Sequence, residues 1–107
     1  MVKVRRSMLI REIQLAEVLE ALADPVRLDM LRVLKEGHEK CKDIEGYQGI
    51  HVSDIAKEMR LPQPTVSKHL AKLRSVGLVK VVRQAQWMYY QRNEEVIARV
   101  KEQLTSL

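Results

Sequence analysis

Apolar residues recur at helical spacing along much of this chain, and several of the helices they predict have clear start and end signals. Residues 8–22 predict a helix with two apolar faces, because their apolar side chains fall on two sides at about 100° per residue. Asp24 followed by Pro25 predicts the start of a second helix, in which aspartate caps free N–H groups and proline lacks one. This helix, over residues 26–35, is apolar nearly all round. We therefore expect it to be buried on most sides and to end at Gly37.

Two helices separated by a short break occupy the middle of the chain. Residues 53–60 carry apolar side chains along one side, and a Leu-Pro pair at positions 61–62 interrupts the pattern. Residues 63–76 predict the second helix, which has an apolar stripe that must face the core: Val66, Leu70 and Leu73. Two helices joined by a tight turn over residues 53–76 predict a helix-turn-helix.

A β-hairpin is predicted directly after these helices, over residues 78–91. Two β-rich runs, Leu78–Val82 and Trp87–Tyr90, flank the basic and polar tip Arg83–Gln86. We expect the aromatic side chains of the second run to pack on the sheet rather than to stack on bases. The predicted fold class is mainly α with a small β-hairpin (α+β), a winged helix-turn-helix. With 107 residues the chain is expected to form one domain, residues 1–107.

The last predicted helix, residues 94–107, begins after the capping residue Asn93 and carries a single apolar stripe. This stripe and the second apolar face of residues 8–22 predict a homodimer, in which the terminal helices pair across a two-fold axis. The alternative is that both helices pack on the core of one chain. The side chains expected at the dimer interface are apolar: Leu9, Ile13, Ala16, Ile97, Val100 and Leu104.

The segment Glu36–Gly49 is polar, contains three glycines and has no lasting period, so it predicts a long connection with one turn of helix near residues 40–45. Its His38 and Cys41 offer two ligands, whereas a closed zinc site needs four. We therefore expect these two residues to be solvated and to hold no metal. Cys41, the single cysteine, is alternatively a redox switch that joins two chains.

Basic residues are concentrated in one part of the chain. The formal net charge is +5, and the segment from Arg60 to Asn93 contains basic residues but no acidic one. Basic surfaces concentrate polyanions, of which nucleic acid is the commonest, so we expect double-stranded DNA as the partner. A solvated basic face without a partner is the alternative.

The polar face of helix 63–76 combines small, hydrogen-bonding and cationic residues, as a helix that enters the major groove requires. We expect four of its residues to read bases, with His69 assisting: Gln63, Thr65, Ser67 and Lys68. Phosphate contacts are expected mainly from Lys72, Lys80 and Arg83, with Arg27 a weaker candidate. At the hairpin tip, Gln84 and Gln86 are placed to touch the backbone or the minor groove.

Three motifs together resemble the ArsR/SmtB-type winged-helix transcriptional repressors: ALADPVRLDMLRVL at 21–34, LPQPTVSKHLAKLRSVGLV at 61–79 and WMYY at 87–90. The resemblance extends from about residue 16 to the end, and this combination of spaced motifs is specific. It implies a homodimer built from the first and last helices. It also implies recognition helices in successive major grooves of a palindromic operator, and release of DNA when an inducer binds.

The chain departs from this family's pattern in three places. Metal-sensing members carry a Cys-Val-Cys motif where residues 50–54 here have no cysteine, and the last helix lacks the histidine of a second family metal site. The connection over residues 36–49 is also longer than usual. The first two departures argue against metal sensing, which leaves the inducer open between a small molecule and a redox signal.

No constellation typical of an enzyme is present in the sequence. Ser67 and His69 lie two residues apart on one predicted helix, face different directions and have no carboxylate nearby to orient the ring. We therefore expect no enzymatic activity and no cofactor. Without a long apolar run, the chain is expected to be cytoplasmic and to avoid membranes. The predicted function is a sequence-specific DNA-binding transcriptional repressor; the alternative is a winged-helix interaction module that binds an acidic partner protein.

Overall fold

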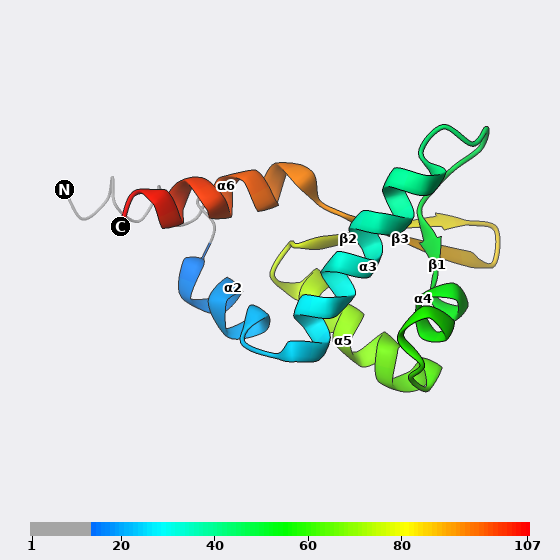
Figure 1. Cartoon of the computed structure of the whole chain (residues 1–107), viewed down its shortest axis with the longest axis horizontal. Coiled ribbons are helices and arrows are strands. Elements are labelled where there is room, and N and C mark those ends of the chain that lie inside the picture. The colour runs from blue at the N-terminus through cyan, green and yellow to red at the C-terminus, as the bar shows by residue number, and fades with distance from the viewer. Residues whose placement is uncertain (1–13) are drawn as a thin grey trace.

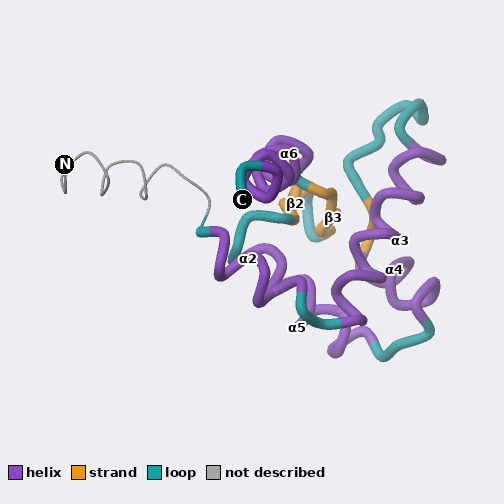
Figure 2. The backbone as a smooth tube through the Cα atoms, turned by 60° about the vertical axis from the view of Figure 1, so that its left-hand side comes forward, coloured by secondary structure: helices purple, strands orange, loops and turns teal. Residues whose placement is uncertain are grey.

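The computed structural model describes residues 14–107, in which five helices and three strands follow one another (Figure 1). The helices are α2 (Leu15–Leu22), α3 (Pro25–Cys41), α4 (Val52–Met59), α5 (Gln63–Ser75) and α6 (Glu94–Thr105). The strands are β1 (Ile50–His51), β2 (Val79–Gln84) and β3 (Trp87–Arg92). In the view of Figure 2, β2 and β3 lie between α6 and the helices α3 and α4. The predicted fold class, mainly α with a small β-hairpin (α+β), is confirmed, and a third short strand extends the hairpin to a sheet.

The sheet has the order β1-β3-β2, and both pairs of neighbours are antiparallel. The hairpin register runs from Val79 opposite Arg92 to Gln84 opposite Trp87, so the strands continue further into the predicted tip than the sequence indicates. Strand β1 is an addition that the sequence analysis missed, because two residues are too short to show a period. It joins the segment before the helix-turn-helix to the wing.

Helix α3 is longer than predicted, because it passes through Gly37 and ends at Cys41. Gly37 does not end the helix. A β-carbon at this position would lie 2.9 Å from Cδ1 of Ile50, so the glycine lets strand β1 pack closely against α3. The connection that follows is accordingly shorter than predicted. The expectation that the helix is buried on most sides holds only in part: Met30 and Leu34 are buried, whereas Leu28 is 50% exposed.

The core is formed mainly by helices α3, α4 and α5, together with β2 and β3. Its largest fully buried side chains are Met30, Leu34, Ile55, Leu70, Leu73, Leu78, Val66 and, from α2, Val18. Arg60 ends α4 in the left-handed conformation, at φ 55°, and the turn before α5 follows. The buried side chains of α4 and α5 therefore anchor this helix pair to the core, and the polar face of α5 is left on the outside.

The terminal helices meet at one end of the molecule, opposite the hairpin (Figure 1). Leu9 and Ile13 lie outside the described residues, whereas Ala16 is exposed on α2. On α6, Val100 is only 4% exposed and belongs to the chain's own core, Ile97 is half-buried and Leu104 is 39% exposed. Within residues 14–107, no helix combines the length and the apolarity needed to cross a membrane.

Candidate nucleic-acid interface

Helix α5 has one buried face and one exposed polar face. Val66, Leu70 and Leu73 are fully buried, as the apolar stripe predicts. The first turns carry Gln63, Ser67 and Lys68 exposed to solvent, with Thr65 half-buried at the edge. Pro62 precedes the helix and provides no side-chain cap, so the first N–H groups have no cap from that residue. The exposed face of α5 is therefore polar and free of carboxylates, and the start of the helix has no side-chain cap from Pro62.

Lys72, a predicted phosphate contact, is held by the first described helix. Its Nζ donates to Oε1 of Glu20 on α2 at 3.3 Å, and the lysine side chain is 40% exposed. This ion pair joins residues 52 positions apart in sequence. A phosphate would therefore have to compete with Glu20 for Lys72.

Arg27 points inward from the first turn of α3. Its Nε donates to the carbonyl oxygen of Ala21 at the end of α2, and its side chain is only 16% exposed. Its Nη1 lies 3.3 Å from Nδ1 of His69 on α5. The guanidinium thus joins three helices, a position that does not support the expected phosphate contact from Arg27.

Asp24 caps α3 beside this arginine, as the Asp-Pro pair predicts. Its Oδ1 accepts hydrogen bonds from the backbone N–H groups of Val26 at 2.8 Å and Arg27 at 3.1 Å. The bond from the Arg27 N–H is the main reason why the pKa of Asp24 lies below its usual value, and it outweighs the opposing effect of desolvation. The carboxylate therefore stays ionised, and its negative charge stabilises the start of α3.

The wing exposes the polar residues expected at its tip. Lys80, Arg83, Gln84 and Gln86 are all exposed, and the guanidinium of Arg83 lies 4.0 Å from the sulfur of Met88. The hairpin turn itself is made by residues 85–86. The wing therefore exposes two basic side chains, Lys80 and Arg83, and two neutral amides.

His51 connects the wing to the helix-turn-helix, a contact that sequence reasoning missed. Its Nδ1 caps α4 by accepting from the N–H of Ser53 at 3.1 Å. The same ring lies edge-on to Trp87 at 5.1 Å and to Tyr89 at 6.0 Å. Because strand β1 fixes His51 opposite Tyr89, the short strand sets the position of the wing relative to α4.

His38 and Cys41 are not arranged as a metal site in the described part of the chain. Nδ1 of His38 lies 3.0 Å from the hydroxyl of Tyr47, and Cys41 is half-buried. Burial, and to a lesser extent the neighbouring Cys41, raises the pKa of Tyr47. Among residues 14–107 no three His, Cys, Asp or Glu side chains come close enough to hold a metal ion.

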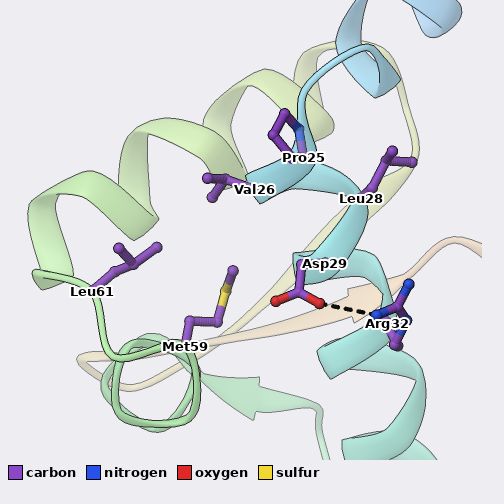
Figure 3. Close-up of a pocket in the computed structure, with 7 residues that line it drawn as sticks. All are labelled: Pro25, Val26, Leu28, Asp29, Arg32, Met59 and Leu61. Carbon is purple, nitrogen blue, oxygen red and sulfur yellow. Dashed lines mark hydrogen bonds and ion pairs between the residues drawn. The ribbon is translucent and has the colours of Figure 1, made fainter.

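A shallow pocket of about 480 Å³ lies beside the helix-turn-helix, between the start of α3 and the end of α4 (Figure 3). Met59, Leu61 and Val26 provide apolar lining, and all three pack against the core. Its two charged side chains pair with each other, because Arg32 donates to Asp29 at 3.2 Å. The pocket therefore presents an apolar surface whose charges are already compensated.

Comparison with known proteins identifies the family. Residues 22–82 match a family described as a helix-turn-helix domain. An HTH-type transcriptional regulator of Methanocaldococcus jannaschii is 35% identical, over 81% of this chain and 91% of the relative. The arsenic resistance transcriptional regulator ArsR2 of Pseudomonas putida is 32% identical, over 82% of this chain and 68% of that protein. The chain belongs to the ArsR family.

A solved structure supports the same assignment for this ArsR-family protein. The homodimeric winged helix-turn-helix DNA-binding domain from Mycobacterium bovis, a possible ArsR-family regulator, is similar with a TM-score of 0.66. The two are 28% identical, over 95% of this chain and 84% of the other. The ArsR-family protein is thus a DNA-binding transcriptional regulator with a winged helix-turn-helix, and its relatives are regulators rather than enzymes.

Proposed function

We propose that this ArsR-family regulator binds a palindromic operator as a homodimer and represses transcription from it. The observation that carries the proposal is the division of α5 into a fully buried apolar face and an exposed polar face. A helix of this kind reads base edges when it is presented to the major groove. A dimer presents two such helices to two half-sites related by the same two-fold axis.

Base reading is assigned to the first turns of α5. Gln63, Ser67 and Lys68 are exposed there, and Thr65 lies beside them. Phosphate contacts are assigned to Lys80 and Arg83, whose side chains are exposed on the wing, and to Lys72 once it leaves Glu20. Gln84 and Gln86 at the wing tip complete the contact with the backbone or the minor groove.

The dimer is assigned to the end of the molecule where α2 and α6 meet. Apolar side chains are exposed there that a second copy would cover: Leu19, Leu28, Leu104 and Leu107. An apolar depression of about 370 Å³ between α3 and α6 belongs to the same surface and is lined by Leu22, Leu31 and Ile97, among others. The homodimeric state of the related Mycobacterium bovis domain supports this assignment.

The test is a pair of affinities measured by fluorescence anisotropy at one salt concentration. An operator is selected from a random DNA pool, and Gln63→Ala and Lys68→Ala are each titrated with this operator and with a random duplex. We expect a loss of about fivefold or more on the operator and little change on random DNA, since a base contact is worth roughly 1–3 kcal/mol. Lys40→Ala, on the exposed last turn of α3, is the charge-matched control. Equal losses on both DNAs would contradict base reading by these residues.

A further inference from the structure

Arg27 and His69 form a contact whose chemistry fixes the state of the histidine ring. Nη1 of Arg27 lies 3.3 Å from Nδ1 of His69, and the same nitrogen is 3.8 Å from Oδ2 of Asp24. Arginine carries only donors and stays protonated in proteins, so Nδ1 must be the acceptor in this pair. The neutral ring then carries its proton on Nε2.

The arginine is itself held in place at both sides. Its Nε donates to the carbonyl of Ala21, and its Nη1 lies 3.8 Å from Oδ2 of Asp24. The side chain is mostly buried, so the guanidinium has little freedom to leave the histidine. The rigid fork of arginine suits this role, because it meets two acceptors in different directions at once.

His69 lies at the edge of the exposed face of α5. It is half-buried and follows Thr65 by one helical turn, next to the exposed Lys68. A half-buried ring whose Nδ1 is engaged by Arg27 and whose proton is on Nε2 offers one hydrogen-bond donor at that edge. DNA phosphates offer only acceptors, and half or more of protein–DNA hydrogen bonds go to phosphate and sugar.

We propose that Arg27 is a positioning residue that holds His69 in the Nε2–H form, so that this nitrogen donates a hydrogen bond to a DNA phosphate. The proposal deepens the proposed function and depends on it for the phosphate. It changes the expected role of His69, from assisting base reading to contacting the backbone. Arg27 thereby acts on DNA binding without touching DNA.

The first test needs no DNA. Imidazole ¹⁵N chemical shifts of the full chain are recorded at about pH 8, above the range in which histidine side chains usually titrate. We expect the Nε2–H tautomer of His69 in the wild type and also in Arg27→Lys, because the ammonium group of lysine likewise carries only donors. Arg27→Gln provides an acceptor oxygen, and the Nδ1–H tautomer of His69 should then become populated. His51, whose Nδ1 accepts from Ser53, is an internal reference that should not change.

An Nδ1–H tautomer of His69 in the wild type, or no change in Arg27→Gln, would overturn the proposal and leave the proposed function intact. Correct folding of each variant is read from the unchanged His51 signals. An absence of DNA binding by the wild type would instead overturn the proposed function itself.

The second test compares two amides in place of the histidine. Glutamine places its N–H₂ near the position of Nε2, whereas asparagine places its amide near Nδ1. We expect His69→Gln to bind DNA nearly as the wild type does. His69→Asn and Arg27→Gln should bind at least about tenfold more weakly, on operator and random duplex alike, because one hydrogen bond to a charged phosphate group of the backbone is lost. Equal affinities of His69→Gln and His69→Asn, or a loss confined to the operator, would contradict the phosphate contact.

Discussion

At the scale of single residues, the polar contacts around α5 differ in how far apart their partners lie in sequence. The cap formed by Asp24 joins neighbours, so the Asp-Pro pair predicts it directly. The contacts Arg27–His69 and Glu20–Lys72 join residues 42 and 52 positions apart. Such pairs depend on how α2, α3 and α5 pack against one another, which no local pattern encodes. For this reason the sequence predicts Lys72 as a phosphate contact and does not reveal its partner.

Acid should weaken the fold partly through Asp24. The pKa of this carboxyl is lowered in the folded chain, so its stabilising effect is complete above the unfolded-state pKa and is lost as the pH falls through the folded-state pKa. We expect Asp24→Asn, which keeps a capping oxygen but does not titrate, to lose less stability than the wild type below about pH 4. Urea unfolding at a series of pH values measures this difference. Parallel pH profiles of the two proteins would show that the carboxylate charge has no such role.

Releasing Lys72 from its ion pair should strengthen DNA binding. In Glu20→Gln the lysine no longer has a charged partner at 3.3 Å and becomes available to a phosphate. We expect tighter binding to any duplex. The slope of log K against log salt should become steeper by up to about one, the value for one additional phosphate contact. Glu17→Gln removes the same charge from an exposed position on the same helix and serves as the control. Identical salt dependences of the two variants would mean that Glu20 acts only through its general negative charge.

At the scale of elements, proline and glycine signals predict the helix-turn-helix well and the segment before it poorly. The helix predicted over residues 63–76 is observed as α5, Gln63–Ser75. Strand β1 and the end of α3 were missed, because both are decided by the close approach of Ile50 to Gly37 and by pairing with β3. That approach is a tertiary contact, and glycine at position 37 is read from sequence alone as a helix end.

Gly49 should be essential for the placement of β1. It has φ +128°, and a β-carbon there would lie 2.7 Å from the carbonyl oxygen of Tyr90. Gly46 also has positive φ, at +80°, but a β-carbon at that position would meet nothing within 4 Å. We expect Gly46→Ala to cost about 1–2 kcal/mol from backbone strain alone and Gly49→Ala to cost clearly more. Chemical denaturation of both variants measures the difference, and equal losses would contradict the close packing at Gly49.

At the scale of the whole molecule, the terminal helices provide both core and exposed surface. Val100 belongs to the core of its own chain, whereas Leu104, one turn further along α6, is 39% exposed. The periodic stripe of α6 predicts both residues at a dimer interface, because a period alone does not show whether a side chain packs on its own chain or on a second copy. The family resemblance adds the expectation of a homodimer, and the exposed leucines are the side chains that we propose for its interface.

A charge in this surface should dissociate the dimer. We expect Leu104→Glu to shift the protein toward monomer and to weaken operator binding, since burying an unpaired carboxylate at the interface costs several kcal/mol. Sedimentation velocity at micromolar concentration measures the change. Ile44→Glu is the matched control, because Ile44 is 60% exposed on the connection after α3. A monomeric wild type, or a dimer that persists in Leu104→Glu, would exclude the assigned interface.

The most direct measurement of the central claim is a hydroxyl-radical footprint of the wild-type protein on its selected operator. Two α5 helices of one dimer, each entering a major groove, should protect two half-sites that are related by a two-fold axis. Their centres should lie about one turn of DNA, roughly 34 Å, apart on one face of the duplex. A single protected patch, or protection without two-fold symmetry, would contradict the proposal that this regulator reads a palindromic operator as a homodimer.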